Sequence, residues 1–149
     1  MGWKNKPTNF ALEILTKTEH HAKRAIGDAL QQVVIHSPVD TGAYRFSHIV
    51  SINSPDYSAK NGQGDVFAAN AMKIASFKLG DIAFIQNNSK QAIVIEFGGY
   101  PNPVKKGTWV KGKGKSKGYY KILSVNGFSR QAPQGVYALA FQYLVSKYK

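Results

Sequence analysis

The sequence predicts one folded domain that mixes α-helices with short β-strands. Three observations predict it: apolar residues recur at helical spacing over residues 9–36, alternate with polar residues over 44–52, and form a second helical face after Pro133. The chain has 149 residues, of which 43% are hydrophobic. It is therefore long enough to bury a core, and we do not expect global disorder.

The first helix is expected over residues 9–36, with Thr8 or Asn9 as its N-cap and Pro38 ending it. Its main apolar stripe consists of Leu12, Leu15, Ala22, Ile26, Ala29, Leu30 and Val33. At about 1.5 Å per residue such a helix is roughly 40 Å long, which is long for a domain of this size. We therefore expect one end to reach beyond its own core toward a neighbour.

A tight turn is expected directly after this helix, at Pro38-Val39-Asp40-Thr41-Gly42. Asp and Thr side chains can each bond the backbone two residues on, and glycine supplies a positive φ. The alternation over Tyr44–Ile52 predicts a strand. Residues 53–64 are rich in Ser, Asn, Gly and Asp and predict an exposed loop.

A second helix is expected over residues 66–79, with Asp65 as its N-cap and Gly80 just after its C-terminus. Residues 81–86 predict a short strand that ends at an Asn-Asn-Ser turn. The run 91–97 is ambiguous, because its β-branched residues favour a strand but periodicity does not decide for so short a segment.

Residues 98–118 differ from the rest of the chain, because glycine alternates with lysine there. The lysines are Lys105, Lys106, Lys111, Lys113, Lys115 and Lys117. We expect a flexible basic loop inserted into the domain, too charged and too glycine-rich to pack. A returning strand is expected over 119–125, a turn at Asn126-Gly127, and a last helix with Pro133 in its first turn.

The charge is strongly uneven along the chain, whose formal net charge is +12. Residues 1–96 hold ten basic and all eight acidic residues, whereas residues 97–149 hold ten basic residues and no acidic one. The chain has no cysteine, which excludes disulfides, thiol nucleophiles and Cys-ligated metal sites. Because it has neither an apolar run of about 18 residues nor an apolar N-terminal stretch, we expect no membrane span or secretory signal.

The titratable residues do not form a pattern typical of catalysis. The four histidines, His20, His21, His36 and His48, are expected to be structural or solvated, and the carboxylates form no pair at a useful spacing. No phosphate loop or nucleophile elbow is present. We therefore expect no enzyme, no catalytic residue, no metal and no cofactor.

One acid stands out, because Glu96 interrupts the otherwise apolar run from Ala92 to Gly98. It is either a buried acid with a functional role or a structural acid that bonds nearby backbone or pairs with a cation. We favour the structural interpretation.

The lysine loop is the strongest chemical signal. Six lysines in thirteen residues, with Trp109 among them, are an electrostatic footprint for phosphates. Such contacts attract nucleic acid without reading its sequence, and the scarcity of arginine argues against bidentate recognition of bases. A solvated loop that orders only on a protein partner fits equally well.

Three blocks of the sequence resemble a family of tailed-phage proteins, the small neck and tail-completion proteins (head–tail connector, minor tail protein Z type). The first block is the Pro-Val-Asp-Thr-Gly turn at 38–42, after a long helix. The second is Asn87-Asn88-Ser89-Lys90-Gln91-Ala92-Ile93-Val94-Ile95-Glu96-Phe97-Gly98, in which Gln91 replaces the usual Tyr. The third is Ser129-Arg130-Gln131-Ala132-Pro133-Gln134-Gly135, before the last helix.

The resemblance implies an α+β fold in which an antiparallel β-sheet is flanked by the long N-terminal helix and the C-terminal helix. It also implies that residues 92–97 form a short helix. Assembly would depend on the matched residues Pro38, Val39, Asp40, Thr41, Gly42, Glu96, Phe97 and Gly98. The lysine-rich segment 104–118 and the loop and helix at 54–79 are longer than the family pattern.

The function implied is that of a structural virion protein, made in the host cytoplasm, which completes the tail or joins it to the head. Such proteins form homo-oligomeric rings, commonly hexamers, between portal-side adaptor, neighbouring neck and tail-tube proteins. The loop lysines are expected to contact such a protein or the genomic DNA in the channel. The alternative is a sequence-independent nucleic-acid-binding protein that acts through its basic loop.

Overall fold

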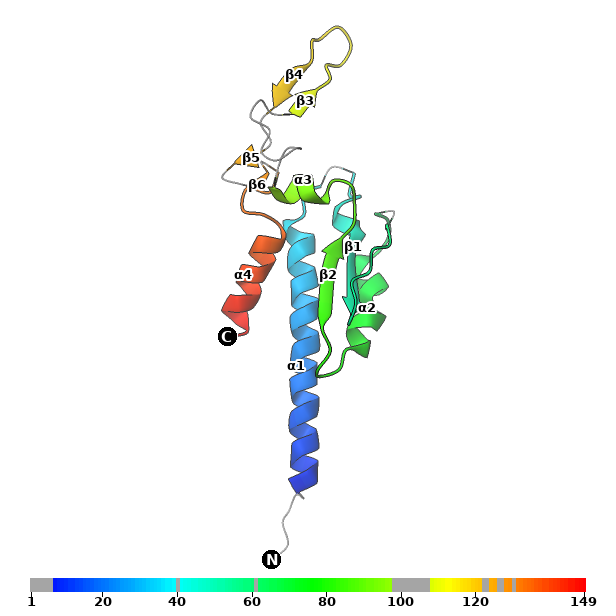
Figure 1. The fold of residues 1–149 in the computed structure, drawn as a ribbon, viewed down its shortest axis with the longest axis vertical. Helices are drawn as coiled ribbons and strands as arrows, with labels where there is room; N and C mark the ends of the chain where they lie inside the picture. Colours follow the sequence, from blue (N-terminus) through cyan, green and yellow to red (C-terminus); the bar gives the residue numbers. More distant parts are fainter. Residues whose placement is uncertain are drawn as a thin grey trace, which may run out of the picture.

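The chain has an α+β fold, in which a long helix, a two-stranded antiparallel sheet and a C-terminal helix form the body (Figure 1). The computed structural model describes residues 7–39, 41–60, 62–97, 108–121, 124–125, 128–129 and 131–149. The predicted fold class is therefore confirmed. The helices are α1 (Pro7–His36), η1 (a 3-10 turn, Arg45–Ser47), α2 (Val66–Ser76), α3 (Ala92–Phe97) and α4 (Tyr137–Lys147). The strands are β1 (His48–Ile52), β2 (Ala83–Asn87), β3 (Thr108–Val110), β4 (Tyr119–Lys121), β5 (Ser124–Val125) and β6 (Phe128–Ser129).

Helix α1 is the axis of the molecule, but the rest of the body covers only its C-terminal part. The helix begins at Pro7, because the fixed φ of proline suits the first position of a helix. The expected N-caps, Thr8 and Asn9, therefore lie inside its first turn. Leu30 and Val33 are fully buried, whereas residues 8–18 are exposed on every side. The prediction that one end extends beyond the core is therefore confirmed (Figure 1).

Strand β1 is shorter than predicted, because the alternating residues at its expected start form a 3-10 turn. The Phe46 amide donates to the Gly42 carbonyl at 3.0 Å, and the Ser47 amide to the Tyr44 carbonyl at 3.1 Å. β1 then pairs antiparallel with β2, from His48 opposite Asn87 to Ile52 opposite Ala83. Most of β1 is buried on both faces, so its burial does not follow the expected alternation.

Helix α2 holds the free edge of β1 through one buried amide. The Asn70 side chain accepts from the Val50 amide at 2.7 Å and donates to the His48 carbonyl at 3.1 Å. Asp65 caps α2 as predicted, by accepting from the amides of Phe67 and Ala68. The helix ends at Ser76, earlier than expected, and Gly80 lies in the following turn with a φ of 97°.

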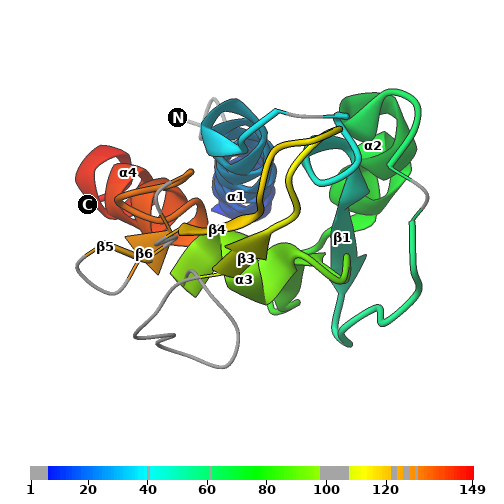
Figure 2. The same cartoon turned by 90° about the horizontal axis from the view of Figure 1, so that it is seen from above.

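The layers follow the order α4, α1, sheet, as the view from above shows (Figure 2). α4 packs along the C-terminal half of α1, and α2 packs against β1. Their buried residues form one core cluster, which consists of Leu30, Val33, Tyr44, Val50, Val66, Ile95, Ala132, Val136 and Ala140.

The basic segment contains a hairpin where a flexible loop was expected. β3 pairs antiparallel with β4, from Thr108 opposite Lys121 to Val110 opposite Tyr119, so a loop is wrong for residues 108–110. Residues 98–107 and the predicted turn Asn126-Gly127 lie outside the described residues. β5 and β6 form a further small antiparallel pair.

The last helix begins at Tyr137, four residues after Pro133, so the prediction of proline in its first turn is wrong. The Gly135 amide donates to the Ala132 carbonyl at 2.9 Å, and Gly135 adopts a φ of 76°. This left-handed residue closes a turn around Pro133 and delays the start of the helix.

Candidate functional site

Helix α3 places the acid of the second block inside the protein. The Ala92 amide donates to the Ser89 carbonyl at 3.0 Å, and the Ile95 amide to the Gln91 carbonyl at 2.8 Å. The segment is thus the short helix that the resemblance implied, despite its β-branched composition. Ile95 enters the core, and Glu96 beside it is buried.

The Glu96 carboxylate caps the N-terminus of α4. Its Oε2 accepts from the amides of Val136 at 2.8 Å and Tyr137 at 3.2 Å, and its Oε1 accepts from the Ala138 amide at 3.3 Å. The first amides of a helix have no partner within the helix and carry partial positive charge. Val136 precedes α4 and has no side-chain oxygen, so an acid from α3 supplies the cap.

Of the two structural interpretations of Glu96, this contact confirms the one in which the acid bonds backbone groups. Hydrogen bonds from backbone N–H groups to an ionised acceptor are about twice as strong as neutral ones. They offset the cost of burying the carboxylate. The bonds also fix α3, and with it the second sequence block, to the first turn of α4.

A second buried contact joins α4 to β1 and α1 through His48. The Ser37 hydroxyl donates to the Val33 carbonyl, so His48 Nε2, at 2.8 Å from Ser37 Oγ, must donate to that hydroxyl oxygen. His48 Nδ1 is then the acceptor for the Tyr137 hydroxyl, at 2.9 Å. The network assigns His48 as the neutral tautomer with its proton on Nε2.

Burial fixes the protonation states of this network. It lowers the pKa of His48 from 6.5 to about 4, because a charged imidazolium would be poorly solvated there. Burial also raises the pKa of Tyr44 and of Tyr137, and the Glu96 carboxylate adds to both shifts. Both tyrosines therefore stay protonated at neutral pH, as the hydrogen bond from Tyr137 to His48 requires.

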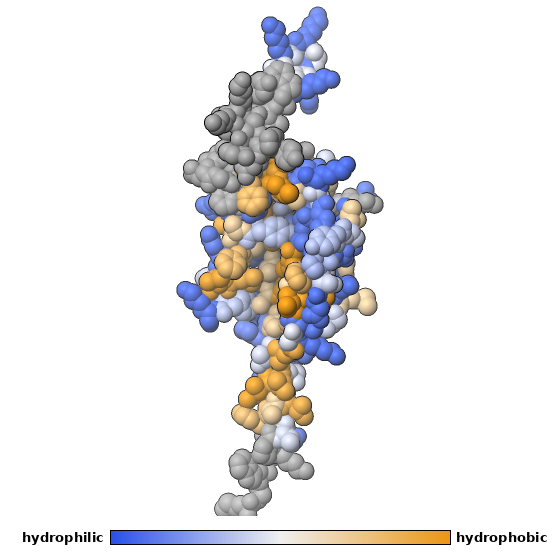
Figure 3. Space-filling model, viewed as in Figure 1, coloured by the Kyte–Doolittle hydropathy of each residue, from blue (hydrophilic) through white to orange (hydrophobic). Residues whose placement is uncertain are grey.

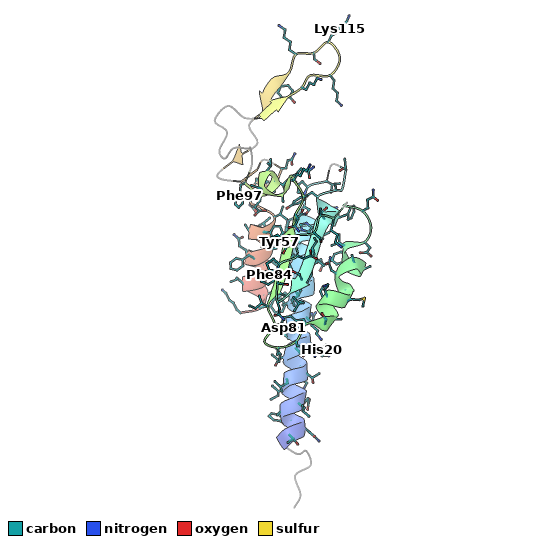
Figure 4. All side chains as sticks on the ribbon, turned by 45° about the vertical axis from the view of Figure 1, so that its right-hand side comes forward. His20, Tyr57, Asp81, Phe84, Phe97 and Lys115 are labelled. Carbon is teal, nitrogen blue, oxygen red and sulfur yellow. The ribbon has the colours of Figure 1, made fainter. Side chains whose placement is uncertain are left out.

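The three sequence blocks meet around one hollow of about 460 Å³. Its lining residues are Pro38, Val39, Thr41, Gly42, Ala43 and Tyr44 from the first block and the residues after it, Gln91, Val94 and Ile95 from the second, and Gln131 from the third. Val39 and Phe97 expose apolar surface, and Figure 4 shows Phe97 at the end of the body that carries α3.

The described residues of the first block have two of the features from which a tight turn was predicted. Gly42 has a φ of 85°, and a Cβ there would lie 2.8 Å from the Phe46 ring, so both the backbone and the packing require glycine. Thr41 Oγ1 accepts from the Ala43 amide, two residues on, as expected. Asp40, like Gly98 of the second block, lies outside the described residues.

The lysines form a separate feature at the tip of the β3–β4 hairpin. Lys111, Lys113, Lys115 and Lys117 are exposed, whereas Lys105 and Lys106 lie outside the described residues. The tip is a hydrogen-bonded turn, in which the Ser116 amide donates to the Lys113 carbonyl at 3.2 Å. Figure 4 shows Lys115 at the end of the molecule opposite to the N-terminal end of α1.

Among the described residues, no group of three or more His, Asp or Glu side chains is placed to hold a metal ion. Within the same part of the chain, no helix is long and apolar enough to cross a membrane. No family model, curated protein or solved structure matches this chain. We therefore base its function on its own geometry and on the resemblance of the three blocks.

Sequence reasoning missed the partners of the two buried polar groups. Ser37 and Tyr137 gave no signal, because nothing in the pattern indicates that a serine 11 residues before His48 and a tyrosine 89 residues after it both bond its ring. For Glu96, two features of the sequence indicate a partner: an acid within an apolar run, and a last helix without a capping side chain at its start. The structure shows that the two are partners.

We predict that Glu96→Leu lowers the free energy of unfolding by about 2–3 kcal/mol, because three amides lose their acceptor. Glu96→Gln keeps one oxygen but loses the charge, and is expected to cost about 1 kcal/mol. Urea unfolding at one fixed protein concentration measures both. Lys60→Gln, at an exposed side chain outside the elements proposed to meet in assembly, is the control and should change little. A Glu96→Leu protein as stable as the original would contradict the capping role.

We also predict that the protein loses stability as the pH falls from about 6.5 to 4.5. Unfolded His48 takes up a proton below about pH 6.5, but folded His48 resists protonation down to about pH 4, so acid favours the unfolded state. The slope of this loss is at most about 1.4 kcal/mol per pH unit in this window.

His48→Gln should flatten that slope, whereas His20→Gln, at an exposed histidine, should keep it. If His48→Gln does not fold, an NMR titration of the imidazole in the original protein decides the matter. A His48 pKa near 6.5 in the folded state would contradict the buried network.

Proposed function

We propose that this chain is a structural subunit of tailed-phage particles, a neck or tail-completion protein that forms a ring at the head–tail junction. One observation carries the proposal: the three resembling blocks, at 38–42, 87–98 and 129–135, come together around a single hollow. Chance matches to a family pattern have no reason to converge in space. Their convergence supports a shared structural unit behind the pattern.

The chemistry of the site supports a structural role over a catalytic one. The buried acid Glu96 and the buried base His48 already have partners within the chain: Glu96 bonds three amides, and His48 bonds Ser37 and Tyr137. A catalytic acid or base needs a free position facing a substrate. Both groups instead bond α4 to other parts of the fold, which is a structural role.

The shape of the subunit also fits a closed assembly. A contact between different surfaces of successive copies generates a ring when the rotation closes. The projecting end of α1 and the hairpin extend from opposite ends of the body, so each can reach a neighbour (Figure 1). The proposed partners are further copies of this chain, a portal-side adaptor, the neighbouring neck proteins and the tail tube.

A second candidate function is sequence-independent binding of nucleic acid. The observation that favours it is the row of four exposed lysines at the hairpin tip, with no acidic residue among residues 97–149. Lysines attract phosphates as point charges and release counterions on binding. Within the ring proposal, the same lysines would contact DNA in the channel or an acidic surface on an adjacent ring.

The ring proposal predicts that the purified protein, alone or after its portal-side partner is added, forms an oligomer that contains several 16.4 kDa subunits. Light scattering after size-exclusion chromatography measures the mass of this oligomer directly. A strict monomer under both conditions, with nanomolar DNA affinity at physiological salt, would contradict the ring and favour the second candidate.

The second candidate predicts that replacing Lys111, Lys113, Lys115 and Lys117 with Gln strongly weakens DNA binding. The slope of log affinity against log salt should become shallower by roughly 0.9 for each phosphate that the lysines no longer neutralise. The control replaces the exposed Lys60, Lys73, Lys78 and Lys90 with Gln, which removes the same charge elsewhere. Equal DNA affinity in both variants would remove the hairpin as a nucleic-acid site.

A further inference from the structure

Residues 8–18 of α1, which we call the arm, form about three turns of helix that the described part of the chain leaves exposed on all sides. Four large apolar residues point out from it: Phe10, Leu12, Ile14 and Leu15. Figure 3 shows this apolar surface along the projecting end of α1. A helix that is apolar around more than one face is normally buried, so the arm is suited to a partner.

The arm is also electrically neutral, although the chain carries a net charge of +12. Its only charged side chains are Glu13 and Lys17, which form an ion pair at 2.6 Å. Copies of so basic a chain repel one another over most of their surface. A neutral, apolar arm is therefore a favourable place for two copies to meet.

A matching surface lies on α4, on the side away from α1. This outer face consists of Ala138, Phe141 and Val145, and Phe141 is 67% exposed. The outer face carries no charge either, because the single charged residue of α4, Lys147, forms an ion pair with Asp28 at 2.6 Å. The arm and α4 are equal in length, each roughly 16 Å long.

The arm and the outer face belong to the same chain but cannot meet within one copy. α4 runs antiparallel to α1, with Lys147 and Tyr148 bonded to Asp28 and the Tyr148 ring 5.0 Å from the ring of His21. α4 thus ends at the level of His21, and the arm continues beyond it. The outer face points away from α1, so only the arm of another copy can reach it.

We propose that the arm of one copy packs on the outer face of α4 in the next copy. Phe10 and Ile14 form one ridge of the arm, at i and i+4, and Phe141 and Val145 form the corresponding ridge on α4. Every copy gives one arm and accepts one, so the contact is heterologous and can close into a ring. This inference rests on the proposed function and specifies its subunit interface.

Two other positions for the arm fit the observations less well. A contact between the same face of two arms would be isologous, would pair copies into dimers and would leave α4 uncovered. The hollow of about 460 Å³ is smaller than three turns of helix about 10 Å across, and it is lined by the polar Gln91 and Gln131.

Cross-linking tests the proposal cleanly, because the chain has no cysteine of its own. The double variant Ile14→Cys with Phe141→Cys, treated with a short bis-maleimide, should give a ladder of covalent oligomers that ends at the ring size. The control pairs Ile14→Cys with Met72→Cys, which is 85% exposed on α2 and lies outside the proposed interface. It should give no ladder above that of Ile14→Cys alone.

The results of cross-linking and of the mass measurement distinguish a failure of the proposed arm contact from a failure of the proposed function. A ring of measured mass without the ladder would overturn the arm contact and leave the proposed function standing. Strong dimers from Ile14→Cys alone would overturn it in favour of arm-to-arm pairing. The absence of any ring, with or without the portal-side partner, would overturn both.

A second variant measures the energetic role of the arm. Ile14→Glu should abolish the ring and leave the melting curve of the monomer unchanged, because this side chain is exposed within its own subunit. Met72→Glu, at an exposed position on α2 outside the proposed interface, should keep the ring. Intact rings in the Ile14→Glu protein would contradict the proposal.

Discussion

The bond between the Glu96 carboxylate and the first turn of α4 is the interaction on which the rest of the structure depends. It joins α3 to α4, and α4 in turn carries Tyr137 to His48 and presents its outer face to solvent. The bond also holds the second block, which lines part of the hollow, close to the end of the third block, just before α4. The cap is therefore a property of the tertiary fold rather than of one helix.

The charge distribution explains why this acid is needed. Glu96 is the last acidic residue of the chain, and α4 begins in a region that has only basic charge. A helix as short as α4 is marginal in water, and its exposed amides favour a negative group near its N-terminus. No residue after Glu96 can supply that charge, so the acid must come from across the fold.

The elements with strong periodicity could be predicted from the sequence, whereas those set by local hydrogen bonds could not. The long helix and its free end followed from the spacing of apolar residues, and Asp65 was identified correctly as a cap. The strand from Tyr44 was wrong over its first residues, because Tyr44 and Phe46 alternate in sequence but bond within a 3-10 turn. The start of α4 was also wrong, because Gly135 bonds within a turn around Pro133 and the helix begins only at Tyr137.

The candidate site was only partly predictable. The positive φ of Gly42 was predicted from its place in the block at 38–42. Glu96 was predicted as an unusual residue, because it is an acid among apolar neighbours. The partners of Glu96 and His48 were not predictable, because they are backbone amides or ordinary polar residues, and most of them lie at least 40 residues away in the sequence. Such contacts depend on how the helices pack, which no local pattern encodes.

The buried polar framework, the projecting apolar arm and the basic hairpin at the opposite end are the features that support a role in assembly. The proposed role at the head–tail junction unites these features with the three resembling blocks. Electron microscopy of phage particles assembled with and without this chain tests that role most directly. We expect that, without it, filled heads and separate tails accumulate. Joined, infectious particles in its absence would contradict the proposed role.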